Sequence, residues 1–156
     1  MGENRISRVA VVTGASRGIG KAIALELAKE GYALALISRN RLEIGQAAAD
    51  IVKMGYDNLC LGFECDVSDC TAVMSTFQEI ADKFGSINVL INNAGGVRNA
   101  YTETADGIET QFALNHLAGF LMTYRLMPYL EKSGGRVIMT GSESHKHMKI
   151  NWKDIM

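Results

Sequence analysis

The sequence lacks an excess of charge of either sign. Its 156 residues contain 16 Lys and Arg residues against 17 Asp and Glu residues, and the isoelectric point is about 6.3. A protein that binds nucleic acid through the phosphate backbone usually carries a basic face or stripe. The charge balance therefore argues against nucleic acid as a partner.

Cysteine is also scarce. Cys60, Cys65 and Cys70 form an odd set with no C-x-x-C pair, whereas disulfide frameworks use even numbers and zinc sites use paired ligands. His145 and His147 would add two metal ligands at most, with no obvious third. We therefore expect reduced thiols, no metal site and a cytoplasmic protein, with a zinc site as a weak alternative.

Long uninterrupted apolar runs are missing as well. The first twelve residues contain no apolar stretch long enough for a signal peptide. The longest apolar run, FALNHLAGFLMTYRLMPYL, is broken by Asn115, His116 and Arg125, each of which would be costly in lipid. We expect this run to form a buried helix, and the protein to be soluble and to have no membrane partner.

What the chain does contain is a regular alternation of two patterns. Short, continuously apolar runs are typical of parallel strands covered on both faces, and they lie at 8–12, 33–37, 58–63, 87–91 and 136–140. Longer helical patterns separate them, at 17–30, 41–54, from the Ser68–Asp69 cap signal to Gly85, and 106–132. Five strands and four helices in alternation predict an α/β, doubly wound parallel sheet with right-handed crossovers.

A glycine-rich turn follows the first predicted strand. Gly14, Gly18 and Gly20 lie between that strand and the first helix, in the spacing G-x-x-x-G-x-G. Glycines there allow a tight turn and let the backbone approach a pyrophosphate at the helix N-terminus. In this strand–turn–helix context the motif predicts a dinucleotide site, and a turn that is glycine-rich by chance is the weaker alternative.

The end of the second strand indicates which dinucleotide binds. An NAD site requires an acidic residue there for the ribose 2′-hydroxyl, whereas this chain has Ser38 and Arg39. A hydroxyl and a guanidinium favour a 2′-phosphate, and Arg17 adds a second positive charge within reach. We therefore predict NADP(H) as the cofactor; the alternative is that both arginines are solvated surface charges.

At these motifs the sequence resembles the short-chain dehydrogenase/reductase family, over essentially the whole chain. TGASRGIG resembles the family's cofactor signature, which implies cofactor-binding roles for Thr13, Gly14, Ser16, Arg17, Gly18, Ile19 and Gly20. CDVSD resembles its third-strand motif and implies that Asp66 bonds the adenine amino group and that Val67 gives backbone contacts. NNAG resembles the motif after the fourth strand, where Asn92 and Asn93 brace the sheet and the backbone of Ala94 and Gly95 borders the cofactor.

Two further motifs resemble the family's active site. ETQFALNHLAGFLMT places Asn115 on its active-site asparagine, and GRVIMTGSESH places Ser142 on its catalytic serine. DGIETQF, NHLAGF and SESHKHMKINWKDI are most similar to retinol-dehydrogenase-like members. The family chemistry is hydride transfer between a nicotinamide and a small-molecule carbonyl or secondary alcohol, in which a tyrosine is the general acid or base and a nearby lysine lowers its pKa. The serine steadies the developing oxyanion, and the asparagine holds a water of the proton relay.

The tyrosine and lysine of that chemistry should follow Ser142 as Y-x-x-x-K. All five tyrosines precede Ser142, and the residues four places after them are Leu36, Cys60, Ala105, Pro128 and Ser133. We therefore expect residues 1–156 to be a single NAD(P)-binding Rossmann domain with strand order 3-2-1-4-5, C-terminally incomplete and truncated before the Y-x-x-x-K helix.

The last helix and the last strand agree with this expectation. The helix at 106–132 is apolar around most of its circumference, as in helices buried on several sides, and the strand at 136–140 would be an open sheet edge. In the family, the helix bearing Y-x-x-x-K and often a partner subunit pack here, so the complete protein would form a homo-oligomer. Covering loops or a dimer partner of this chain are the alternative.

The sequence thus predicts the cofactor-binding portion of an NADP(H)-dependent oxidoreductase that interconverts a ketone or aldehyde with an alcohol. This portion alone should bind cofactor with negligible turnover. A non-catalytic NADP(H)-binding sensor or interaction module, and an unstable product of a shortened reading frame, stay open as alternatives.

Overall fold

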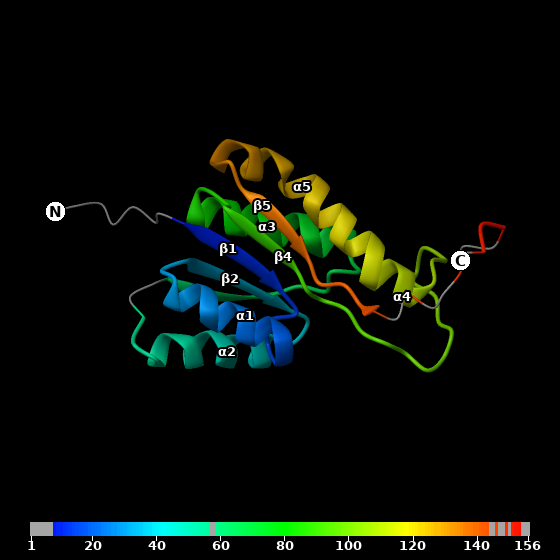
Figure 1. Cartoon of the computed structure of the whole chain (residues 1–156), viewed down its shortest axis with the longest axis horizontal. Helices are drawn as coiled ribbons and strands as arrows, with labels where there is room; N and C mark the ends of the chain where they lie inside the picture. Colours follow the sequence, from blue (N-terminus) through cyan, green and yellow to red (C-terminus); the bar gives the residue numbers. More distant parts are fainter. Residues whose placement is uncertain (1–7, 57–58, 144–145, 147–148, 150, 154–156) are drawn as a thin grey trace.

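The chain folds around a five-stranded parallel sheet of strand order β3-β2-β1-β4-β5 (Figure 1). The computed structural model describes residues 8–56, 59–143, 146, 149 and 151–153. The strands are β1 (Val9–Thr13), β2 (Ala33–Ser38), β3 (Cys60–Glu64), β4 (Val89–Asn92) and β5 (Arg136–Met139). The predicted Rossmann-type topology and strand order are confirmed. Asn58, at the start of the third predicted strand, lies outside the described residues, as do His145 and His147.

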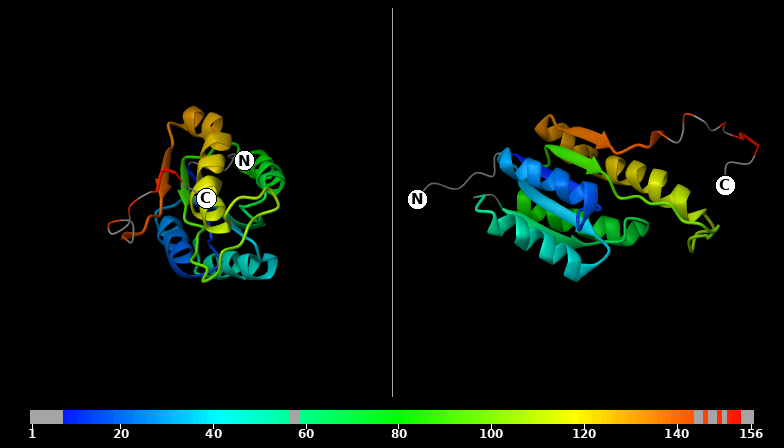
Figure 2. Two further views of the ribbon diagram at one scale, coloured as in Figure 1. Left: turned by 90° about the vertical axis from the view of Figure 1, so that its right-hand side faces the viewer. Right: turned by 60° about the horizontal axis from the view of Figure 1, so that its bottom comes forward.

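Helices cover both faces of the sheet, as Figures 1 and 2 show. α1 (Gly18–Lys29) and α2 (Arg41–Lys53) pack on one face, and α3 (Cys70–Phe84) and α5 (Ala118–Ser133) pack on the other. The short α4 (Thr110–Phe112) and the π-helix η1 (Ala113–Leu117) lead into α5. Alternate residues of β1 divide the core: Val9 and Val11 pack in the cluster that includes residues of α3 and α5, whereas Ala10 and Val12 pack in the cluster that includes residues of α1 and α2. The continuous apolar pattern of β1 follows from this burial on both faces.

Side chains define where several helices begin. The Asn40 side chain accepts hydrogen bonds from the first-turn amides of α2, and the Asp69 side chain does the same for α3. Gly85 ends α3 with φ 73°, a left-handed conformation that glycine adopts without strain. The signals read from the sequence at Asp69 and Gly85 therefore bound α3 at the predicted positions.

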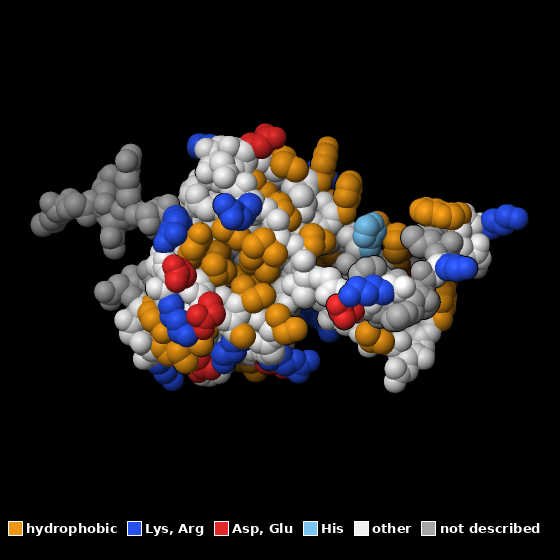
Figure 3. All heavy atoms as spheres, viewed as in Figure 1, with side chains coloured by type: hydrophobic (Ala, Val, Ile, Leu, Met, Phe, Trp, Pro, Cys, Tyr) orange, Lys and Arg blue, Asp and Glu red, His pale blue; other side chains and the backbone are white. Residues whose placement is uncertain are grey.

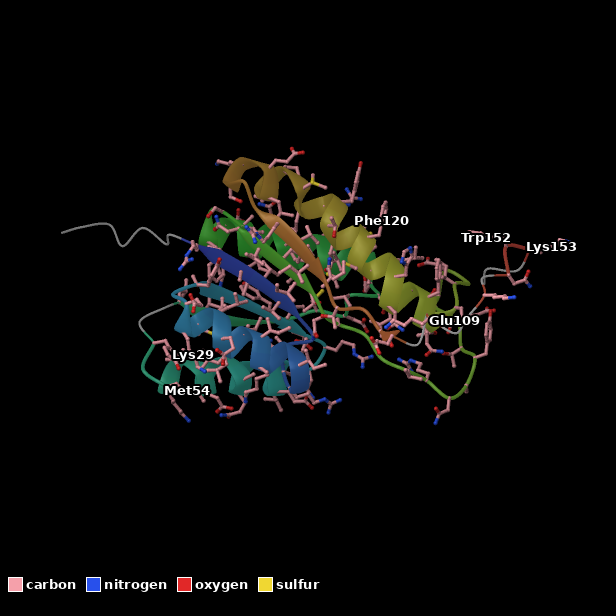
Figure 4. The ribbon with its side chains drawn as sticks, viewed as in Figure 1. Lys29, Met54, Glu109, Phe120, Trp152 and Lys153 are labelled. Atoms are coloured by element: carbon pink, nitrogen blue, oxygen red, sulfur yellow. The ribbon has the colours of Figure 1, made fainter. Side chains whose placement is uncertain are left out.

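The fourth predicted helix begins four residues later than expected. Residues 106–109 were predicted to be helical, but Gly107 has φ 73°, and Glu103 forms an antiparallel bridge with Glu109. The Glu109 carboxylate accepts hydrogen bonds from the amides of Gln111 and Phe112 and thereby caps α4 (Figure 4). The helix begins later than predicted because the left-handed backbone at Gly107 is not helical and the Glu109 side chain caps the helix N-terminus at Thr110.

The sheet edge at β5 and the outer side of α5 are apolar and exposed. All four residues of β5 are exposed, and Phe120 and Tyr124 on α5 are 66% and 64% exposed. Figure 3 shows hydrophobic side chains gathered at the centre of the face on which β5 lies, and Figure 4 shows Phe120 directed outward from α5. The predicted strand 136–140 is thus present, but it is not covered on both faces as its apolar pattern had indicated. Among the described residues, no helix is both long and apolar enough to cross a membrane.

Candidate nucleotide-binding cleft

A cleft of about 1060 Å³ lies at the carboxyl ends of β1, β2, β3 and β4. Its lining consists of Gly14, Ser16, Arg17, Gly18, Ile19, Ile37, Ser38, Arg39, Asn40, Arg41, Leu42, Glu43, Glu64, Cys65, Val67, Asn93, Ala94, Gly95 and Leu114. In open parallel sheets, ligands bind in the crevice beyond the carboxyl ends of the strands, where the strand order reverses. This cleft lies at that crevice, and its volume is at the upper end of the range for small-molecule sites.

The glycine turn brings backbone groups to the cleft. Gly14 has φ 64°, and a Cβ atom on it would lie 3.0 Å from the Cα atom of Ala94. A Cβ atom on Gly20 would lie 2.3 Å from the carbonyl oxygen of Gly14. Only glycine permits this close approach of α1 to the turn. At the N-cap of α1, Arg17 makes no side-chain capping hydrogen bond, so the first-turn amides of this helix remain available to an anion.

Thr13 and Asn93 hold the turn against the end of β4. The Thr13 hydroxyl donates to the carbonyl oxygen of Ile91 (3.3 Å) and accepts from the amides of Asn93 (3.0 Å) and Ala94 (2.9 Å). The Asn93 side-chain amide donates to the carbonyl oxygens of Thr13 (3.0 Å) and Gly14 (3.4 Å). Thr13 is fully buried and is not among the lining residues, so it braces the cleft from behind.

Asn92 braces the outer strands from a buried position. Its side-chain amide donates to the carbonyl oxygen of Gly119 (3.3 Å), the Thr123 hydroxyl (3.1 Å) and the Met139 sulfur (3.1 Å). Its Oδ1 atom is buried and finds no hydrogen-bond partner among the described residues. Asn92 thus ties β4 to α5 and β5, which agrees with the bracing role implied by the resemblance.

Positive charge gathers at the glycine turn and at the end of β2. Arg17, Arg39 and Arg41 all line the cleft and are exposed, and within the described part of the chain none of them forms an ion pair. Two carboxylates, Glu43 and Glu64, line the same cleft. The arrangement leaves guanidinium groups free to bind a phosphate, which they match in geometry and charge.

Of the two residues predicted from the third-strand motif, Val67 and Asp66, only Val67 lines the cleft. Asp66 instead accepts hydrogen bonds from the Ser68 amide (3.0 Å) and hydroxyl (2.7 Å). Cys65 also lines the cleft, and burial raises the pKa of its thiol. Asp66 therefore shapes the loop whose neighbours form the cleft wall.

Asn115 lies in the π-helix η1, and its side chain is hydrogen-bonded to Gly96 in the loop after β4. Its Oδ1 atom accepts from the Gly96 amide (2.9 Å), and its Nδ2 atom donates to the Gly96 carbonyl oxygen (3.0 Å). Ser142 is exposed two residues beyond Thr140, whose amide donates to the Asn92 carbonyl oxygen (2.9 Å). π-helical turns occur frequently at functional sites. Neither Asn115 nor Ser142 lines the cleft itself. Asn115 contacts Gly96, the neighbour of the lining residue Gly95. Ser142 follows Thr140, whose hydroxyl donates to Oδ1 of the lining residue Asn93.

Several wall residues were not predicted from the sequence: Ile37, Asn40, Arg41, Leu42, Glu43, Glu64, Cys65 and Leu114. Four of them belong to the start of α2, where the Asn40-x-x-Glu43 spacing is a capping-box signal that marks a helix N-terminus at the end of β2. Among the described residues, no group of three His, Cys, Asp or Glu side chains could hold a metal ion.

The chain is similar to many dehydrogenases and reductases. Retinol dehydrogenase 12 from Mus musculus is 36% identical over 149 residues, which cover 95% of this chain and 47% of the relative. The 3-oxoacyl-[acyl-carrier-protein] reductase from Mus musculus is 38% identical over 140 residues, with 88% of this chain and 57% of the relative covered. The chain therefore spans about half the length of the curated relatives it matches.

Solved structures agree with these relatives. The alcohol dehydrogenase from the archaeon Thermococcus sibiricus, complexed with 5-hydroxy-NADP, superposes with a TM-score of 0.80 at 28% identity, covering 91% of this chain and 61% of that structure. An NAD⁺-bound xylitol dehydrogenase superposes with a TM-score of 0.77 at 29% identity, and the match covers 93% of this chain and 56% of the xylitol dehydrogenase chain. The family model described as short chain dehydrogenase matches residues 8–153. The chain therefore belongs to the short-chain dehydrogenase family, and among the members of that family it is similar to retinol dehydrogenases.

Proposed function

We propose that the cleft binds NADP(H) and that the protein is an NADP(H)-dependent oxidoreductase. The observation that carries the proposal is the close approach of Gly20 to Gly14, where a Cβ atom on Gly20 would lie 2.3 Å from the Gly14 carbonyl oxygen. It lies beside the N-terminus of α1, whose N-cap residue Arg17 makes no side-chain capping hydrogen bond. A pyrophosphate fits that arrangement because free helix amides and the positive end of the helix dipole both stabilise anions. The donor set of the cleft thus fits the cofactor of the family.

The choice of NADP(H) over NAD(H) rests on the groups at the end of β2. Ser38 stands where an acidic residue would bond a ribose 2′-hydroxyl, and the Arg39 guanidinium follows it. Arg17 extends the positive charge from the glycine turn. A 2′-phosphate carries close to two negative charges at neutral pH, and the guanidinium groups would hold it through charge-assisted hydrogen bonds.

For the reaction, we assign roles to the two residues near the cleft edge. When bound, the nicotinamide accepts or supplies the hydride that interconverts an alcohol and a carbonyl compound. Asn115 orders the loop after β4 through its two hydrogen bonds to Gly96 and would hold a water of the proton relay, and the Ser142 hydroxyl would donate to the developing oxyanion. The substrate class we propose is a ketone, aldehyde or secondary alcohol.

A non-catalytic NADP(H)-binding module is the second candidate. The observation that favours it is the exposed apolar surface of α5 and β5, which offers a place for another protein. A partner that binds this surface only in the presence of NADP(H) would support the module.

The experiment that tests the cofactor proposal compares equilibrium binding of NADPH and NADH to the purified protein, by fluorescence titration. We expect NADPH to bind about ten- to hundredfold more tightly, because one or two charge-assisted hydrogen bonds distinguish the two cofactors. Arg39→Ala should remove most of that difference, and Arg125→Ala, which removes an exposed cation on α5 outside the cleft, should leave it unchanged. Equal affinities in the wild-type protein would contradict the choice of NADP(H).

A further inference from the structure

Glu43 places a carboxylate in the cleft that Arg17, Arg39 and Arg41 line. It lies in the first turn of α2, whereas Arg17 belongs to the glycine turn and Arg39 and Arg41 follow β2. Its Oε1 atom accepts from the Asn40 side-chain amide (3.4 Å), and its Oε2 atom accepts from the Ser16 hydroxyl (3.3 Å). Glu43 therefore bridges the glycine turn after β1 and the helix that follows β2.

This bridge joins the two segments that would flank the phosphates of the cofactor. Ser16 belongs to the glycine turn, and its hydroxyl is a donor that a phosphate could use if the Glu43 carboxylate did not hold it. The carboxylate also faces a cleft in which the cations Arg17, Arg39 and Arg41 have no ion-pair partner within the described segments. A carboxylate in such a cluster lowers the local positive potential and repels an added anion.

We propose that Glu43 is a specificity-determining residue that limits how strongly the cleft prefers a 2′-phosphorylated dinucleotide. The inference rests on the proposed function, because it concerns the same cofactor. NADP(H) differs from NAD(H) by the 2′-phosphate alone, so the repulsion from Glu43 acts on the difference between the two cofactors. Glu43 thereby keeps the affinity for NADP(H) below the value that the three arginines would otherwise produce.

The test removes the charge in two ways. Glu43→Gln keeps the side-chain acceptor that suits the third residue of a helix, and Glu43→Ala removes that acceptor as well. In both variants the ratio of NADPH affinity to NADH affinity should rise by about two- to fivefold, the range expected for a solvent-exposed charge interaction. The rise should come from tighter NADPH binding and should shrink at high ionic strength. Glu79→Gln, which removes an exposed carboxylate on α3 at the other face of the sheet, is the matched control and should leave the ratio unchanged.

Adenosine 2′,5′-bisphosphate and adenosine 5′-phosphate serve as a second probe pair, because they restrict the comparison to the adenosine half of the cofactor. The same change in ratio is expected for them, and thermal unfolding of each variant checks that it is folded.

An unchanged ratio in both variants would overturn the inference while leaving the proposed function intact, provided that wild-type protein prefers NADPH. A rise caused only by weaker NADH binding would also overturn it, because Glu43 would then be an acceptor for the ribose hydroxyl. If Glu43→Ala, but not Glu43→Gln, lowered the affinities for NADPH and NADH equally, Glu43 would act only as a structural bridge to Ser16, and the inference would also be overturned. If the wild-type protein binds neither cofactor, the proposed function fails first.

Discussion

Replacing Gly20 by alanine should damage both the fold and the cleft. The added methyl group would lie 2.3 Å from the Gly14 carbonyl oxygen and 2.6 Å from the Asn93 side-chain nitrogen. The closest of these atoms belongs to the backbone, and the Asn93 nitrogen is itself held by hydrogen bonds to Thr13 and Gly14. The methyl group can therefore be accommodated only if α1 moves away from the glycine turn.

Two opposing effects determine how much Gly20→Ala changes the free energy of unfolding. Overpacking of a well-packed site typically costs about 1–3 kcal/mol, and a rigid backbone neighbour places Gly20→Ala at the upper end. Alanine is favoured over glycine within a helix by about 1 kcal/mol. We therefore expect a net loss of about 1–2 kcal/mol in the free energy of unfolding, measured by urea denaturation, and a loss of NADPH affinity of about tenfold or more as the phosphate-facing amides shift.

Gly45→Ala is the matched control. Gly45 also lies within a helix, but a Cβ atom there would meet nothing within 4 Å. This variant should gain about 0.5–1 kcal/mol through helix propensity and a less flexible unfolded chain, with unchanged NADPH affinity. If Gly20→Ala were as stable as Gly45→Ala and bound NADPH normally, the close approach of α1 to the turn would not be needed, and our reasoning about the cleft would be refuted.

Three further predictions follow from buried or paired groups. Thr13→Val should lower the free energy of unfolding by about 1–3 kcal/mol, because two part-buried backbone amides lose the buried hydroxyl that accepts from them, whereas Thr13→Ser should not; urea denaturation distinguishes them. The Lys21 ammonium 2.6 Å away and a side-chain amide hold the pKa of Asp50 below its usual 3.8, so the stability it contributes is present above about pH 4 and is lost as the pH falls through the folded-state pKa. The difference in stability between wild type and Asp50→Asn should therefore be constant above about pH 5 and disappear on acidification; a difference independent of pH would exclude this pairing. Burial raises the pKa of Cys60 to about 11, so iodoacetamide at about pH 8 should modify the exposed Cys70 first, as peptide mass spectrometry would show, and faster labelling of Cys60 would contradict its burial.

The parallel sheet could be predicted because its signals are local. β1 and β2 are buried on both faces and read as continuous apolar runs, and Asp69 and Gly85 bound α3 at positions that their side chain and backbone conformation dictate. The start of the fourth helix was wrong because the Glu109 cap depends on a chain reversal at Gly107 that helical periodicity does not reveal.

Only part of the cleft could be predicted, because some of its residues are brought together by the tertiary structure and not by a local sequence motif. Its glycine turn is contiguous in sequence, and a family resemblance adds the residues after β3 and β4. The roles of Arg41 and Glu43 depend on how α2 is placed beside the turn, which follows from the strand order and from the Ser16–Glu43 contact across 27 positions of sequence. Pairwise contacts of this kind leave no periodic signal in the chain.

The most direct test of the account is a titration of isotope-labelled protein with NADP⁺, followed by amide chemical shifts in two-dimensional NMR spectra. The account predicts the largest shifts at the amides of residues 14–20, 38–41 and 93–95, with smaller shifts on the outer face of α5. The central claim, that the cleft at the carboxyl ends of the strands binds the dinucleotide, would be contradicted if these amides did not shift while others did, or if saturating NADP⁺ left the whole spectrum unchanged.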